Sequence, residues 1–160
     1  MKSVFKIHFV CLFAMLPILL ASCEKKSQFF AGKTFENSTW NRFDILEYDF
    51  DIENTAKNYD FILETTINEQ FPIEILPLNI TIYYPNGGKR SRDYDFRLKD
   101  AEKNWKGIVD GNKIKFEIPI NRGMSLNQKG IYQIRIENKY TKYNLSGIEN
   151  MYFFVYFSDK

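Results

Sequence analysis

The sequence predicts an all-β protein, a single antiparallel β-sandwich of the immunoglobulin-like kind with about seven to eight strands. From Trp40 onward, apolar and polar residues alternate with a period of two, as expected for strands that bury one face. The alternating runs are short, and turn residues separate them at intervals typical of sandwiches. The helical period of about 3.6 residues is not sustained anywhere in this region. Residues 100–105 are the one segment where a single helical turn is expected.

The first expected strand has the clearest alternation, with Leu46, Tyr48, Phe50 and Ile52 on one face and Glu47, Asp49, Asp51 and Glu53 on the other. Five further runs alternate in the same way, and their expected apolar faces are Tyr59, Phe61, Leu63, Thr65 and Ile67; Leu78, Ile80, Ile82 and Tyr84; Tyr94, Phe96 and Leu98; Ile114, Phe116 and Ile118; and Tyr132, Ile134 and Ile136. The last run, residues 151–157, is apolar on both faces. It is therefore expected to be a central strand or a strand covered on both sides.

Turn residues lie between these runs. Residues 85–88 (Pro-Asn-Gly-Gly) and 110–112 (Asp-Gly-Asn) predict tight turns, because Asn and Gly tolerate positive φ. Gly123 and Gly130 are expected to bracket a longer loop. Just after Gly130, Tyr132 has the position of a tyrosine that anchors a corner of a sandwich.

The first 22 residues have the features of an export signal. Lys2 and Lys6 form a positive start, and a largely apolar run extends to Leu20. A transmembrane helix is the alternative, but His8 and Pro17 interrupt the run, which only just reaches the minimum spanning length. A secretory signal is therefore favoured.

The segment Leu20-Ala21-Ser22-Cys23 resembles the lipobox of bacterial lipoproteins. The resemblance implies cleavage between Ser22 and Cys23 and a diacylglycerol on the Cys23 sulfur. Two or more acyl chains anchor a protein stably, since each buried methylene contributes roughly 0.8 kcal/mol. A plain signal peptide with a chance cysteine is the alternative.

Three segments are therefore expected: a lipoprotein signal peptide (1–22), a lipidated cysteine with a polar spacer (23–37) and the β-sandwich domain (38–160). Phe29 and Phe30 can alternatively begin a strand. In some bacteria, Asp directly after the lipid cysteine retains a lipoprotein in the inner membrane. Here that residue is Glu24, so sorting to the outer membrane is favoured. Lipoproteins exported to the cell surface often carry an acidic cluster just after the cysteine, and Glu24 followed by two lysines matches this pattern poorly. A periplasm-facing position is therefore favoured over surface exposure.

Cleavage before Cys23 would leave 138 of the 160 residues, with 20 basic residues (22 less Lys2 and Lys6) against 20 acidic ones. This near-neutral balance gives no reason to expect a nucleic-acid partner. His8 and Cys11 would be lost with the signal. No disulfide, catalytic triad with histidine, or zinc site with histidine or thiolate could then form. No cofactor is expected.

Three groups of residues are candidates for a site. Alternate carboxylates at Glu47, Asp49, Asp51 and Glu53 could bind Ca²⁺ or supply a glycosidase acid pair, but a solvated strand face kept charged against aggregation is favoured. Trp105, Tyr83 and Tyr143 could stack on sugars, but packing within the sheets is favoured. The loose basic stretch of Arg90, Arg92, Arg97, Lys99, Lys103 and Lys106 is interrupted by acids and predicts a solvated mixed-charge surface.

The order of several short motifs resembles the gliding-motility lipoprotein H (GldH) family of Bacteroidetes. The motifs are Leu20-Ala21-Ser22-Cys23, Trp40 with the strand through Phe50, Phe71-Pro72, Tyr84-Pro85-Asn86-Gly87, Trp105-Lys106-Gly107, Gly130-Ile131-Tyr132 and Gly147-Ile148. The resemblance implies a small envelope lipoprotein without catalytic residues, required for gliding and located beside the machinery linked to type IX secretion.

We therefore expect a non-enzymatic envelope component that is anchored in the membrane by its lipid and binds a protein complex of the gliding or secretion machinery. A glycan-binding or glycan-uptake accessory lipoprotein is the alternative, and a hydrolase that uses only carboxylates is a third class. An exposed apolar patch or a bare sheet edge would favour the first. A concave aromatic surface would favour the second, and two facing carboxylates about 5–10 Å apart the third.

Overall fold

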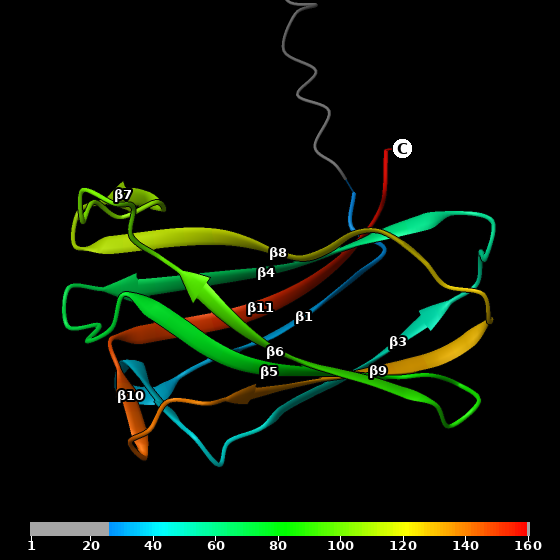
Figure 1. The fold of residues 1–160 in the computed structure, drawn as a ribbon, viewed down its shortest axis with the longest axis horizontal. Coiled ribbons are helices and arrows are strands. Elements are labelled where there is room, and N and C mark those ends of the chain that lie inside the picture. The colour runs from blue at the N-terminus through cyan, green and yellow to red at the C-terminus, as the bar shows by residue number, and fades with distance from the viewer. Residues whose placement is uncertain (1–25, 160) are drawn as a thin grey trace, which may run out of the picture.

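Eleven strands, all paired antiparallel, make up the fold in the computed structural model, which describes residues 26–159 (Figure 1). The expected signal peptide, its cleavage site and Cys23 lie outside these residues. Within residues 26–159, the structure contains no helix with the length and apolar character that crossing a membrane requires.

Two sheets form the layers of a sandwich. The larger sheet has the order β1 (Phe29–Thr34), β11 (Ile148–Phe157), β4 (Asn58–Asn68), β8 (Lys113–Ser125) and β7 (Ile108–Asp110). The smaller sheet has the order β3 (Leu46–Ile52), β9 (Gly130–Asn138), β5 (Ile75–Tyr83) and β6 (Lys89–Arg97). A two-stranded ladder of β2 (Thr39–Asn41) and β10 (Asn144–Ser146) follows a short 3-10 turn (Glu36–Ser38). The predicted antiparallel sandwich is confirmed.

The seven predicted runs correspond to β3, β4, β5, β6, β8, β9 and β11. The expected count of seven to eight strands is too low, because β1, β2, β7 and β10 were not among them. Three of these four strands have only three residues each, which is too short for alternation to be recognised.

The expected boundary between spacer and sandwich at residue 38 is wrong, because β1 already belongs to the larger sheet. It pairs with β11 from Phe29 opposite Val155 to Thr34 opposite Asn150, so the strand alternative for Phe29 and Phe30 holds. Phe29 packs inward against Phe50, with ring centroids 5.8 Å apart, whereas Phe30 is 53% exposed. The remainder of this edge strand is Ala-Gly-Lys-Thr, which gives the sequence no alternating apolar signal.

Two local expectations are also wrong. Residues 100–105 form no helical turn, because the Asp100 carboxylate accepts the backbone N–H groups of Glu102 and Asn104, both at 2.9 Å. Gly123 does not open a loop, because β8 continues to Ser125. Its φ of 66° lies where the register between β4 and β8 shifts, as in a β-bulge.

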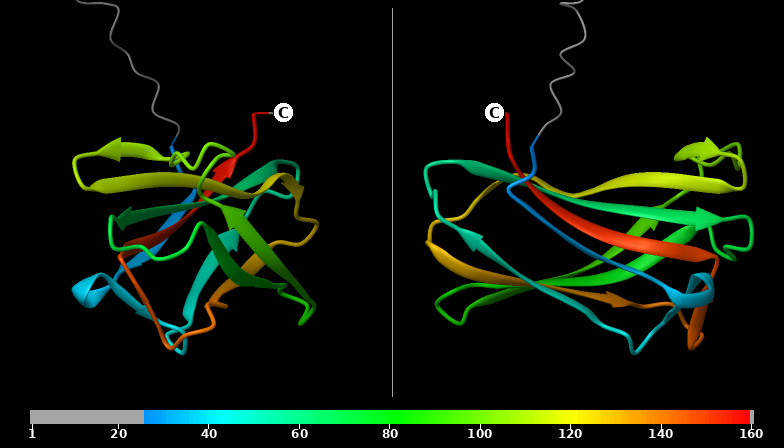
Figure 2. Two further views of the ribbon diagram at one scale, coloured as in Figure 1. Left: turned by 60° about the vertical axis from the view of Figure 1, so that its left-hand side comes forward. Right: turned by 180° about the vertical axis from the view of Figure 1, so that it is seen from behind.

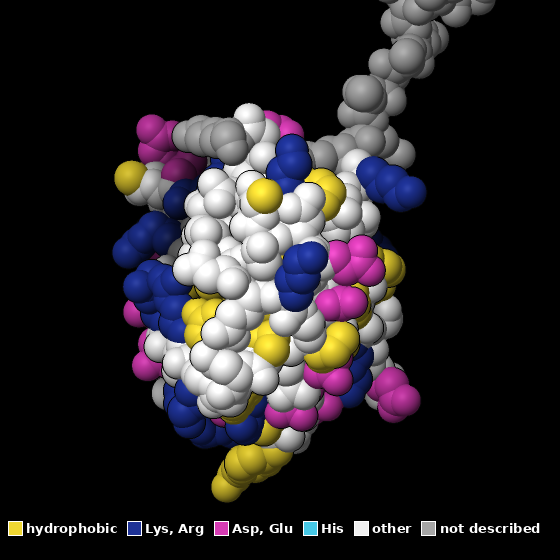
Figure 3. Space-filling view, turned by 90° about the vertical axis from the view of Figure 1, so that its right-hand side faces the viewer, with side chains coloured by type: hydrophobic (Ala, Val, Ile, Leu, Met, Phe, Trp, Pro, Cys, Tyr) yellow, Lys and Arg dark blue, Asp and Glu magenta, His cyan; other side chains and the backbone are white. Residues whose placement is uncertain are grey.

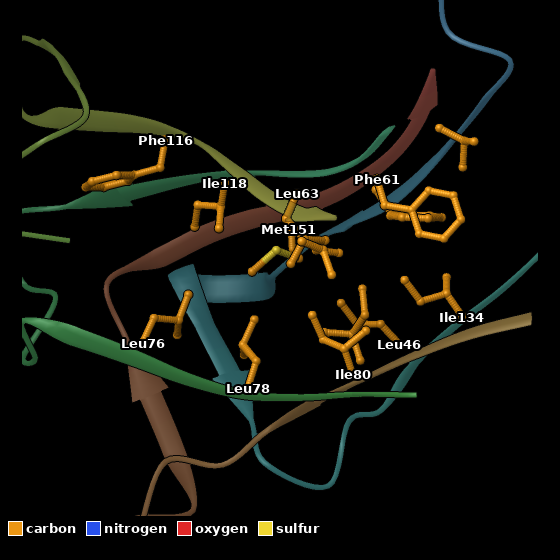
Figure 4. Close-up of a cluster of buried hydrophobic side chains, with 14 of the residues drawn as sticks. Leu46, Phe61, Leu63, Leu76, Leu78, Ile80, Phe116, Ile118, Ile134 and Met151 are labelled. Atoms are coloured by element: carbon orange, nitrogen blue, oxygen red, sulfur yellow. The ribbon is translucent and has the colours of Figure 1, made fainter. Parts of the chain in front are cut away.

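The inner faces of the two sheets form the core (Figure 4). Leu76, Leu78 and Ile80 of β5 lie opposite side chains from the larger sheet, among them Leu63 and Ile118. The predicted apolar positions on β4, β8 and β9 are all buried. Apolar area removed from water stabilises such a sandwich at about 25 cal/mol per Å².

Strand β11 is central, as predicted, because it lies between β1 and β4. Its inner residues Met151, Phe153 and Val155 are buried. Its outer residues are only half-buried, and Phe154 packs on Phe30 with ring centroids 4.9 Å apart. The two apolar faces therefore mark a central strand with one aromatic outer face, rather than a strand between two layers.

The predicted tyrosine corner is present. Tyr132 is 1% exposed, and its hydroxyl donates to the carbonyl oxygen of Gln128 at 3.0 Å. The bond fixes the loop between β8 and β9 against the start of β9. A similar bond joins the Tyr59 hydroxyl to the carbonyl oxygen of Asn54, at 2.7 Å, before β4.

Candidate functional site

The three aromatic candidates from the sequence do not lie together. Tyr83 pairs with Gln133 near the start of β9, whereas Tyr143 follows the end of β9. Trp105 lies in the segment between β6 and β7. No single concave surface therefore combines these three rings.

Two of these rings, Trp105 and Tyr143, also have packing partners. Trp105 is half-buried between Phe116, in edge contact at 6.2 Å, and the Lys99 ammonium, 4.3 Å from the ring centroid. Tyr143 is 68% exposed and rests on Phe43, with centroids 5.8 Å apart. These contacts favour the packing interpretation over a platform for sugars.

The acidic stripe lies on the outer face of β3, an edge strand of the smaller sheet. Glu47 lies 3.5 Å from the guanidinium of Arg135, and Asp49 accepts a hydrogen bond from the Gln133 amide at 2.9 Å. The hydrogen bond that the Arg135 guanidinium donates to the Tyr83 hydroxyl oxygen is the largest cause that raises the pKa of Arg135, and the negative charges of Glu137 and Glu47 raise it further. These contacts support the solvated charged face that the sequence favoured.

A metal or acid-pair role has no geometric support in this stripe. Within residues 26–159, no three His, Cys, Asp or Glu side chains gather in a way that could hold a metal ion. Asp51 is an exposed residue near the end of β3, and Glu53 lies just beyond the strand. They border a polar hollow of about 530 Å³ with Tyr59 and Phe157.

A different feature, at one open side of the sandwich, is the best candidate site. There the C-terminal end of β6, in the smaller sheet, approaches β7 and β8 of the larger one (Figure 1). The right-hand view of Figure 2 shows β1 and β3 on the opposite side, from behind. Between β6 and β8 lies a groove of about 510 Å³, here called the β8 groove. Its lining residues are Glu64, Phe96, Arg97, Leu98, Lys106, Gly107, Ile108 and residues 115–119.

The groove begins where β7 stops. Strand β7 pairs with β8 only at residues 113–115 of β8, and residues 116–125 have β4 on one side and no strand of the described chain on the other. Strand β6 is likewise paired on one side only, by β5. Two bare strand edges therefore border the groove.

Gly107 explains why the chain leaves β8 at this point. A Cβ atom here would lie 2.5 Å from the carbonyl oxygen of Lys115, so only glycine allows this close approach. Just before it, the Lys106 N–H donates to the Leu98 carbonyl oxygen at 2.9 Å, and Trp105 pairs with Lys99. The segment therefore folds back on itself instead of extending β7 along β8.

The groove combines an apolar wall with cations. Phe96, Phe116 and Ile118 supply apolar surface, and Phe96 stacks on Tyr94 with centroids 5.3 Å apart. Five charged side chains also line the groove, and two of them, Lys115 and Glu64, pair at 3.0 Å. Arg97 and Lys106 have no carboxylate within ion-pair distance in residues 26–159. An apolar wall beside cations that have no ion pair within the described residues can serve as a binding surface.

The buried tyrosines predict an alkaline limit to stability. Burial, with the charge of Asp44 as a smaller cause, raises the pKa of Tyr48 to about 12, and burial also raises the pKa of Tyr59 and Tyr132. Above pH 10 the unfolded phenols ionise first, so the free energy of unfolding falls as the pH rises from about 10 towards 12. Melting temperatures at pH 9, 10 and 11 check this. The melting temperature of Tyr48→Phe should fall less steeply with pH than that of the native chain. Equal slopes for the two proteins would show that Tyr48 does not contribute.

Comparisons with known proteins agree on one family. A family model described as the GldH lipoprotein matches residues 28–152. A protein of Christiangramia forsetii named a gliding motility lipoprotein GldH homolog is 22% identical over 152 residues, which cover 94% of this chain and 91% of the relative. The gliding motility lipoprotein GldH of Flavobacterium johnsoniae is 24% identical over 98 residues, which cover 61% of this chain and 58% of that protein.

Proposed function

Since the chain belongs to the GldH lipoprotein family, we propose that it is a non-enzymatic, lipid-anchored component of the gliding or secretion-associated machinery of the cell envelope. The single observation that carries a binding role is the bare β8 edge beside an apolar groove. The proposal places the lipid on Cys23 after cleavage behind Ser22. It places the domain at the outer membrane, facing the periplasm.

The position of β1 supports a close tether. Five residues separate Cys23 from Phe29, so the lipid would hold the start of β1 within roughly 20 Å of the bilayer. The start of β1 lies beside the end of β11, where the Gln28 N–H donates to the carbonyl oxygen of Val155 at 2.7 Å. This end of the sandwich would then face the membrane.

Figure 3 views the end of the sandwich that lies at the right in Figure 1. Lys and Arg side chains are interspersed there with Asp and Glu, and hydrophobic side chains show as separate spots. The β8 groove lies on the long open side instead.

The proposal is tested in cells that carry the full-length gene. Labelled palmitate should be incorporated into the native chain and not into Cys23→Ala. A photo-crosslinking residue at Lys106 or Glu117, beside the groove, should capture one envelope protein of the gliding or secretion machinery. The same residue at Asp49, on the outer face of the smaller sheet, is the control. Missing palmitate would contradict the anchor, and equal capture at Asp49 would contradict the binding role.

A further inference from the structure

We propose that the β8 groove binds an extended acidic segment of a partner protein, which adds to the larger sheet as a strand in line with β7. This inference rests on the proposed function and adds the chemistry of the partner. It follows from three properties of the groove: its backbone, its apolar wall and its charge.

The backbone provides a vacant strand position. Strand β7 occupies the outer edge of β8 only opposite residues 113–115, and no strand of residues 26–159 pairs with that edge along residues 116–125. An incoming chain in an extended conformation would find unpaired N–H and C=O groups of β8 at residues 116–118, beside the groove. Pro119 and the shift of register near Phe61 then interrupt the edge, so a short segment fits best.

The apolar wall provides contacts for alternate side chains. In an added strand, every second side chain would face the inner layer, where Phe96, Phe116 and Ile118 line the groove. Ile108, which is 75% exposed, borders the same groove at the start of β7. Apolar or β-branched residues at alternate positions of the partner segment would fill this space.

The positive charges near the groove favour acidic residues at the remaining positions of the partner segment. Arg97 and Lys106 line the groove without an ion-pair partner, and Glu117 is the one lining acid that Lys115 does not neutralise. Further along β6, Arg90 and Arg92 alternate in register with Tyr94, so they lie on the strand face that turns towards the larger sheet. Neither has a carboxylate within 4.0 Å in the described chain. Carboxylates on the partner would complement these cations.

The same cations disfavour a second copy of this chain. Inward-facing charges and an edge proline are devices that keep bare strands from pairing with their own kind. Pairing two β8 edges would involve Pro119 of both copies, and proline lacks an N–H donor. An acidic segment would instead form ion pairs with the arginines.

Synthetic peptides of about ten residues test the proposal with the full acylated chain in detergent micelles. The first alternates Glu with Val, the second alternates Lys with Val, and the third is the Glu peptide with N-methyl groups on alternate amides. The Glu peptide should bind and slow hydrogen exchange at residues 116–118. The Lys peptide and the N-methylated peptide should each bind roughly tenfold more weakly, because they lose charge pairing and backbone hydrogen bonds respectively.

A charge reversal and its control complete the test. The double variant Arg97→Glu with Lys106→Glu should bind the Glu peptide roughly tenfold more weakly and the Lys peptide more tightly than the native chain does. Lys139→Glu with Lys142→Glu, the same change at exposed lysines after β9, should leave both peptides unaffected. Equal binding of the Glu and Lys peptides, or protection away from β8, would overturn the proposal. If, without peptide, the protection of β8 from hydrogen exchange increased with protein concentration, a second copy of this chain would occupy the edge and the proposal would be overturned.

The outcomes also separate this inference from the proposed function. A crosslink specific to Lys106 or Glu117 in cells, combined with no preference for the Glu peptide, would keep the binding role and reject the acidic strand. Loss of both results would reject the groove as a binding site. Palmitate incorporation tests the anchor independently of either.

Discussion

Replacing Phe50 with alanine is expected to lower the free energy of unfolding by about 4 kcal/mol, because the side chain joins both sheets at the centre of an aromatic cluster. Phe50 is 2% exposed. Its ring lies 5.5 to 5.8 Å, between centroids, from the rings of Phe29, Phe61, Tyr132 and Phe153. The truncation removes buried apolar area, leaves a cavity and deletes four aromatic contacts. A loss of this size is a large part of the usual stability of a domain, about 5–15 kcal/mol.

Urea unfolding of the full chain, followed by far-ultraviolet circular dichroism, measures the effect. Phe43→Ala is the matched control, because Phe43 is 69% exposed and packs on a single ring, so its truncation should cost less than about 1 kcal/mol. Phe50→Leu should lie between the two and keeps the test informative if Phe50→Ala does not fold. Equal losses for Phe50→Ala and Phe43→Ala would show that the cluster does not hold the two sheets together.

The long strands were predictable because one face of each is buried and the other is not. On β8, for example, Ile114, Phe116 and Ile118 are buried, and the charged residues between them are exposed. Burial of one face therefore requires apolar residues at every second position, which is visible in the sequence. The same rule explains why β11 was expected in the centre of a sheet.

The short strands were not predictable from that rule. All three residues of β7 are exposed, so no alternation exists to be found. Strand β2 pairs with β10, more than 100 positions later, and only Trp40 of its three residues is buried. These strands form because the tertiary structure brings their partners together, and no local pattern records that.

The candidate site was missed for the same reason, since it is defined by the point where β7 ends. Trp105 was a candidate because of its ring, but in the structure that ring packs against Phe116 at the groove wall. The available signal was Gly107 beside Ile108 and Val109, a glycine next to two apolar residues outside any alternating run. The basic stretch from Arg90 to Lys106 was recognised, but its position beside a bare edge depends on the pairing of β6 and β8 with other strands.

Gly147→Ala is expected to lower the free energy of unfolding by about 3 kcal/mol, because two separate penalties act at this residue. Its φ is +78°, where an L side chain is strained. A Cβ atom would also lie 2.4 Å from the backbone nitrogen of Phe71 and 2.7 Å from the carbonyl carbon of Gln70. Backbone atoms cannot turn away as a side chain can, so the link between β4 and β5 would have to shift. Phe71, which is 6% exposed, would shift with it and disturb the core.

Gly87→Ala separates the two penalties, because Gly87 has almost the same φ, +82°, and its Cβ would meet no atom within 4 Å. It should cost only the conformational part, about 1 kcal/mol. The difference between the two urea-unfolding free energies then measures the clash at Phe71 alone. Equal losses would mean that the segment between β4 and β5 moves freely enough to absorb a methyl group. In that case the turn before β11 would not be fixed by the contact between Gly147 and Phe71.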